Sequence, residues 1–100
     1  MARKPVSSVT PLALEGDLDV FSIHAQWEQV LPLQGSEGPT VALDLSGIGD
    51  VDLSGMQLLC TLDRDLRAKG RQLVLTGIKE EWRTRFGPMG FAAILEGNAS

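Results

Sequence analysis

The chain has few of the residues that most enzymes use for chemistry: its 100 residues include one cysteine, Cys60, and one histidine, His24. A single cysteine excludes an internal disulfide framework and any zinc site built from several cysteines. A single histidine excludes most histidine-based metal sites and catalytic triads. No nucleophile is accompanied by a recognisable base. We therefore expect a protein that is not an enzyme and has no catalytic residues, metal ligands or cofactor.

Positive charge and long apolar runs are also scarce. The formal net charge is −4, and an acidic chain without a basic stripe is a poor candidate for binding nucleic acid. No segment approaches the roughly 18 consecutive apolar residues that span a bilayer. The basic residues Arg3 and Lys4 are followed by Pro5, Ser7 and Ser8 instead of the apolar core of a secretion signal. These features predict a cytoplasmic protein that does not insert into a membrane.

What is present is an ordinary globular composition, 43% hydrophobic and 22% charged, in a length that suits one domain. We expect this domain to span residues 8–97, with flexible ends at residues 1–7 and 98–100. The charge is unevenly distributed along it. Residues 1–50 contain seven acidic and two basic side chains, whereas residues 51–100 contain six acidic and seven basic ones.

Four short segments have the pattern of strands. Residues 9–14 are apolar and interrupted by Pro11, which suits an edge strand. Residues 15–20 begin with turn-forming residues and then alternate, which predicts a hairpin into a second strand. Residues 41–45 and 72–75 are short apolar runs, and the first of them predicts a central strand buried on both faces. Residues 47–52 are expected to form a loop.

Three segments have helical periodicity. Residues 22–31 predict a helix capped by Ser22, and a longer helix has its apolar face at Met56, Leu59, Leu62 and Leu66. In the longer helix we expect ion pairs between residues 63 and 67 and between residues 65 and 69, with a glycine at position 70 ending it. Residues 78–86 predict the last helix, and the apolar residues 91–95 form an element of unassigned type. The order predicts an α/β domain: a mostly parallel sheet of four to five strands with an antiparallel edge hairpin, and helices packed on it.

The junction before the longest helix has the most informative chemistry. Ser54 precedes Gln57 by three residues, which is the spacing of a capping box, where the serine hydroxyl accepts a hydrogen bond from the helix. The same hydroxyl, beside Gly55 at a helix start, is equally well placed to accept a phosphoryl group. Asp44, Asp50 and Asp52 also suggest an acidic cluster for Mg²⁺, but the partner residues of such a site are missing, and loop solvation explains them. The residues leave open whether Ser54 is a cap or a phosphorylation site.

These residues resemble the STAS domain family. The resemblance rests on Leu43-Asp44-Leu45-Ser46, then five residues, then Asp52-Leu53-Ser54-Gly55-Met56, with further similarity at residues 15–20 and 70–75. In the anti-sigma factor antagonists of this family the junction is Asp-Ser-Ser-Gly, and the serine before the glycine is phosphorylated. That serine corresponds to Ser54 here and the acidic residue to Asp52, while Leu53 replaces the usual Ser or Thr.

A second branch of the family is also similar. STAS proteins resembling the small subunit of the Mla phospholipid-transport system have Asp-Thr-x-Gly at the junction, followed by a leucine-rich helix like residues 55–59. The functional threonine of that branch corresponds to Leu53, which has no hydroxyl. Stand-alone proteins associated with chemotaxis systems belong to this branch too.

The resemblance implies a non-catalytic regulatory protein in signal transduction and transcription regulation. It would bind a kinase-type anti-sigma factor and be released by phosphorylation of the phosphoacceptor Ser54. The alternative is a constitutive adaptor subunit of an Mla-like transport ATPase complex, or a chemotaxis-associated protein. The expected partner-binding residues are Asp50, Asp52, Leu53, Ser54, Gly55 and Met56. Homo-oligomerisation is left open.

Overall fold

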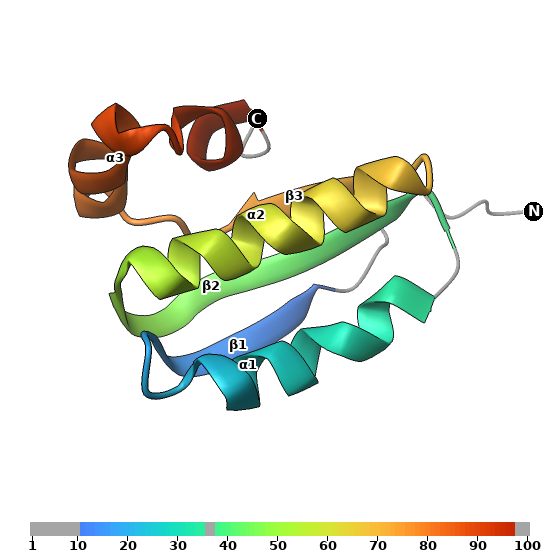
Figure 1. The fold of residues 1–100 in the computed structure, drawn as a ribbon, viewed down its shortest axis with the longest axis horizontal. Helices are drawn as coiled ribbons and strands as arrows, with labels where there is room; N and C mark the ends of the chain where they lie inside the picture. Colours follow the sequence, from blue (N-terminus) through green and yellow to red (C-terminus); the bar gives the residue numbers. More distant parts are fainter. Residues whose placement is uncertain (1–10, 36–37, 98–100) are drawn as a thin grey trace, which may run out of the picture.

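The computed structural model describes residues 11–35 and 38–97 and forms a small α/β domain (Figure 1). The element order is β1 (Leu12–Leu18), α1 (Ile23–Val30), the 3-10 helix η2 (Leu31–Gly35), β2 (Thr40–Val51), α2 (Leu53–Ala68), β3 (Gln72–Thr76), α3 (Glu80–Phe86), the 3-10 helix η3 (Gly87–Met89) and the π-helical η4 (Ala93–Gly97). The expected flexible ends, residues 1–7 and 98–100, lie outside the described residues. None of the helices in the described part of the chain is long and apolar enough to cross a membrane.

The sheet has the order β1-β2-β3, and both strand pairs are parallel. Its helices pack on one face: α1 contacts β1, and α2 contacts all three strands. Along β2, Val41 and Leu43 are buried while Ala42 and Asp44 are partly exposed. The prediction that this central strand is buried on both faces is therefore wrong, because helices cover one face only.

The C-terminal elements complete the core from the side of α2 opposite α1 (Figure 1). Trp82 and Phe86 of α3, with Ile94 and Leu95 of η4, are buried in the same apolar cluster as the sheet and α2. The apolar residues 91–95, whose type the sequence left open, thus supply the last part of the core in a π-helical turn.

The expected antiparallel hairpin is absent from the described residues, which form three parallel strands and not four to five. Residues 15–18 continue β1 and pair with the far end of β2, where Gly16 lies opposite Ile48 and Leu18 opposite Val51. Gly16, at φ +93°, lies between register shifts in this pairing. Its positive φ therefore allows an irregularity within the strand and does not reverse the chain. Because residues 15–18 pair with them, residues 47–51 form strand, where a loop was expected.

Side chains cover backbone groups at the two edges of the sheet. On β1, the Gln26 side-chain amide donates to Glu15 O at 2.8 Å and to Asp17 O at 2.9 Å, and this glutamine is buried. Where β2 continues beyond its pairing with β3, Lys79 Nζ donates to Ile48 O and Arg85 Nη2 donates to Val51 O. Carbonyl groups that no strand pairs are thereby satisfied.

The helices agree with the periodicity, with some differences at their ends. Ser22 precedes α1, but its side chain makes no capping bond; Asp19 Oδ1 accepts from Phe21 N and Ser22 N instead. In α2, the expected pair between Asp63 and Arg67 is confirmed at 3.0 Å. Gly70, at φ +73°, ends this helix as expected.

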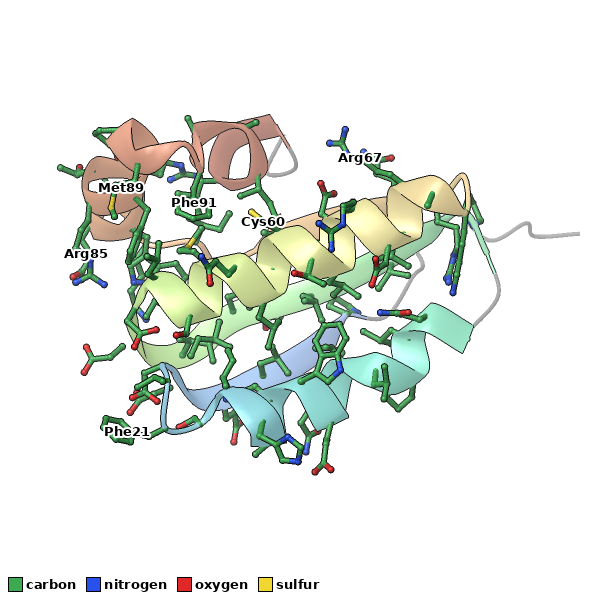
Figure 2. The ribbon with its side chains drawn as sticks, viewed as in Figure 1. Phe21, Cys60, Arg67, Arg85, Met89 and Phe91 are labelled. Atoms are coloured by element: carbon green, nitrogen blue, oxygen red, sulfur yellow. The ribbon has the colours of Figure 1, made fainter. Side chains whose placement is uncertain are left out.

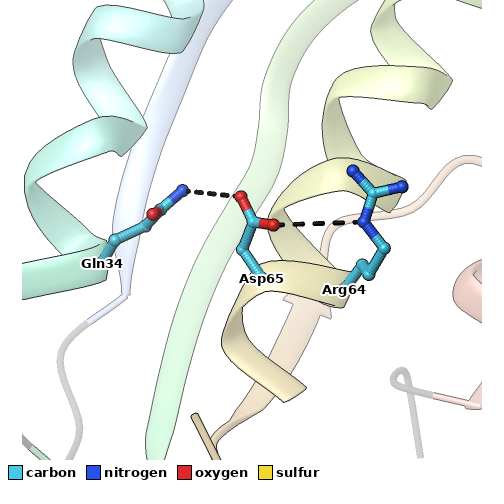
Figure 3. Close-up of polar contacts among 3 residues, drawn as sticks. All are labelled: Gln34, Arg64 and Asp65. Atoms are coloured by element: carbon cyan, nitrogen blue, oxygen red, sulfur yellow. Dashed lines mark hydrogen bonds and ion pairs between the residues drawn. The ribbon is translucent and has the colours of Figure 1, made fainter. Parts of the chain in front are cut away.

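The expected pair between Asp65 and Lys69 is wrong. Asp65 accepts from the Gln34 side chain at 3.2 Å and lies 4.0 Å from the Arg64 guanidinium (Figure 3). Lys69 Nζ donates to the Gln34 carbonyl oxygen. The segment after α1 competes for both side chains, which the periodicity of α2 alone does not reveal.

Candidate functional site

The predicted site lies where β2 ends and α2 begins. Asp52 is the N-cap of α2: its Oδ1 accepts from Ser54 N at 2.8 Å and from Gly55 N at 3.2 Å. Of the two alternatives for Ser54, the capping box is not formed, because the helix begins at Leu53 and Asp52 is its N-cap. Ser54 lies inside the first helical turn, and within the described residues its hydroxyl makes no hydrogen bond.

Asp52 also connects the first turn of α2 to the loop that precedes α1. Its Oδ2 accepts from Val20 N at 3.0 Å, and its own N–H donates to Leu18 O at 3.0 Å. Gly55 is buried directly against β1, since a Cβ at this position would lie 2.2 Å from Leu18 O. One carboxylate and one glycine thus fix the position of Ser54 relative to the end of β1.

The six predicted partner-binding residues differ in how accessible they are. Asp50 and Leu53 are exposed, and Asp52 and Ser54 are partly exposed. Gly55 and Met56 are buried, and Met56 belongs to the apolar core. The last two position the surface and do not form it.

A groove of about 360 Å³ runs between α1 and α2, and Ser54 is one of its lining residues. The other lining residues are Ile23, His24, Trp27, Gln57, Leu58 and Thr61. On α2, Ser54, Leu58 and Thr61 lie on one helical face at spacings of four and three residues, a signal that was present in the sequence. The contribution of α1, with the partly exposed Trp27, depends on how the two helices pack.

An exposed apolar cluster, which the sequence analysis missed, lies beside this groove. We call Val20, Phe21 and Leu53 the apolar tip; their exposed fractions are 57%, 93% and 42%. Figure 2 shows Phe21 pointing away from the body of the domain. The apolar tip is one unit because the bond from Val20 N to Asp52 joins its two segments.

Carboxylates surround the apolar tip. Asp17 Oδ1 accepts from Asp50 N at 2.9 Å, Asp19 holds the amides of the loop, and Asp52 holds the start of α2. With Lys79 and Arg85 bonded to the last residues of β2, the end of the domain that presents Ser54 is apolar and has more carboxylates than cations. This combination is suited to contact with another protein.

Two titratable side chains outside the predicted site, Asp44 and Cys60, have shifted pKa values. Among the described residues no group of three or more His, Cys, Asp and Glu side chains is arranged to hold a metal ion. Asp44 lies within β2, where hydrogen bonds from Ser46 lower its pKa and keep it ionised. Cys60 lies on α2, where burial and, to a lesser degree, the charge of Asp63 raise the pKa of its thiol.

Comparison with known proteins identifies the family. No curated protein matches the chain significantly. The sequence profile of a family described as "Mlab, STAS domain" matches residues 2–96. STAS domains are generally non-catalytic, commonly mediate protein–protein interactions, and act as regulators or adaptors. Because the match extends over nearly the whole sequence, the chain belongs to the STAS domain family.

Proposed function

We propose that this chain is a regulatory STAS protein that binds a kinase-type anti-sigma factor in the cytoplasm and is released when Ser54 is phosphorylated. The observation that supports this best is the division of roles at the junction. Asp52 caps α2, so the Ser54 hydroxyl is not needed for the fold and lines an open groove. We propose that residues 8–97 form the domain that performs this role.

A phosphoryl group on Ser54 would act by charge and by volume. It adds about −1.5 to −2 charges at neutral pH, next to the Asp52 carboxylate and at the side of an apolar groove. The amides of Ser54 and Gly55 already bind Asp52, so they are not free to receive the phosphate. The modification would therefore block a partner by its volume and by the cost of burying a charged group in an apolar contact, without refolding the helix.

The test is phosphorylation by the cognate kinase with ATP, followed by peptide mass spectrometry. We expect one phosphoserine, lost in Ser54→Ala and retained in Ser46→Ala, which removes another hydroxyl from an exposed serine. The phosphorylated protein and Ser54→Asp should bind the partner at least about tenfold more weakly, because burying an unpaired charge in an apolar contact costs about 1.4 kcal/mol or more. Failure of a kinase that is active on another substrate to modify the chain would contradict the proposal.

A constitutive adaptor in an Mla-type phospholipid-transport ATPase complex is the second candidate, and the family description favours it. The position of the branch's threonine is occupied by the exposed Leu53, so an apolar contact would replace the hydroxyl contact. In this case the chain and the ATPase subunit would co-purify, and Ser54→Ala would bind as tightly as the wild type. A chemotaxis-associated role would instead be indicated by co-purification with a chemotaxis protein.

A further inference from the structure

Phe21 is the most exposed of the large apolar side chains in the described part of the chain, at 93%. We propose that it is the anchor of the partner interface, inserted into an apolar pocket whose rim on the partner is basic. This inference rests on the proposed function, because it specifies the partner surface that the Ser54 site meets. Aromatic side chains are frequent anchors of protein interfaces, where a few residues dominate the affinity.

The loop that holds Phe21 is already ordered in the free protein. Asp19 Oδ1 accepts from Phe21 N at 3.1 Å and from Ser22 N at 2.9 Å, and Asp52 Oδ2 accepts from Val20 N. Because these bonds fix the backbone on both sides of the Phe21 side chain, binding costs less backbone conformational entropy. Leu53, which precedes Ser54, and the α1–α2 groove that Ser54 lines extend the apolar surface.

The charge around the apolar tip indicates which kind of partner fits. Asp17, Asp19 and Asp52 organise the two loops, and Asp50 is exposed beside them. Two cations, Lys79 and Arg85, also reach this end of the sheet and bind carbonyl groups of β2, but the four carboxylates outnumber them, and α3 lies on the far side of α2 from α1 (Figure 1). A second copy of the chain would bring two acidic rims together, which is repulsive. A partner with Lys and Arg around an apolar pocket complements both features.

The experiment measures binding of the purified chain to a purified candidate partner, first the kinase-type anti-sigma factor and then the transport ATPase subunit. Phe21→Ala is compared with Met89→Ala, which removes another exposed apolar side chain (55% exposed) from η3. We expect Phe21→Ala to weaken binding at least about 30-fold and Met89→Ala by less than about twofold. Circular dichroism and thermal unfolding verify that both variants are folded.

Salt and charge test the basic rim. The association rate should fall as the salt concentration rises, and Asp50→Asn should lower it at low salt, because complementary charges steer association. An association rate that is independent of salt would overturn the basic rim.

The outcomes separate this inference from the proposed function. If Phe21→Ala binds like the wild type while Ser54→Asp binds poorly, the anchor is refuted and the Ser54 switch stands. If neither candidate partner binds the wild type, both are refuted. If the wild type forms a concentration-dependent dimer that Phe21→Ala abolishes, the occupant is a second copy and the basic-partner inference is overturned.

Discussion

Substitution of Gly55 by alanine tests the packing that positions the whole site. A Cβ at this position would lie 2.2 Å from Leu18 O, 2.7 Å from Leu18 Cβ and 2.9 Å from Leu18 C. Real Cβ atoms essentially never approach closer than 3.0 Å, and none of these three atoms is the end of a flexible side chain. The start of α2 must therefore move away from β1, taking the Asp52 cap with it.

The magnitude follows from two opposing effects. Alanine favours the helix over glycine by about 1 kcal/mol. Overpacking of a tightly packed site costs about 1–3 kcal/mol, and the upper value applies because the clash is with backbone. We expect the free energy of unfolding to fall by about 2 kcal/mol. For a domain of this size that corresponds to a decrease in Tm of roughly 8–16 °C.

Urea unfolding followed by circular dichroism measures this change. The matched control is Gly87→Ala: this glycine has helical angles of φ −53° and ψ −51°, and a Cβ there meets nothing within 4 Å. The control should be neutral or more stable by up to about 1 kcal/mol. If Gly55→Ala unfolds at the same urea concentration as the wild type, α2 does not lie against β1 as closely as described, and the reasoning fails.

Three further predictions use other contacts. Asp52→Ala should lower the free energy of unfolding by about 2–3 kcal/mol, because it removes the α2 cap and the acceptor of a loop amide. Asp52→Asn keeps one acceptor oxygen and should lower the free energy of unfolding by less. Equal decreases for the two variants would refute the capping role of Asp52. Gln26→Ala should cost about 1–3 kcal/mol in the same assay, since two β1 carbonyl groups lose their donor; an unchanged urea midpoint would show that water replaces the amide without loss. The pH profile of Cys60 alkylation should have its midpoint above 9.0, the ordinary pKa of the thiol, because burial raises that pKa. Asp63→Asn should move the midpoint down without restoring 9.0, and a midpoint at or below 9.0 in the wild type would contradict the prediction.

The sequence predicted those elements that are determined by a local residue pattern. The apolar face of α2, β3, the glycine that ends α2 and the charges of α3 all follow from local patterns. The hairpin was wrong because Gly16 and its acidic neighbours are typical of a turn, whereas β2 is long enough to pair with them as strand. Local preference cannot reveal a partner strand about thirty residues away.

The sequence pointed to the junction between β2 and α2 but left open which residue caps the helix. Asp52 and Ser54 are both good N-cap residues, and only the geometry decides that Asp52 caps α2 and Ser54 does not. The exposure of Phe21 and the groove beside Trp27 depend on how α1 is placed against α2, which no periodicity within either helix determines. The sequence therefore did not reveal the groove or the apolar tip, and the roles of Ser54 and its neighbours in partner binding stay predictions.

The bonds from Lys79 and Arg85 to the far end of β2 also bear on how the chain folds. During synthesis β2 is complete long before α3, so its last residues present an unpaired strand edge until residue 85 is available. An exposed edge of this kind can pair with another chain and start aggregation. The segment from Lys79 to Arg85, which is synthesised late, thus covers the edge of a strand that is synthesised early. A protein shortened before Lys79 would leave that edge exposed and would lack the aromatic part of the core.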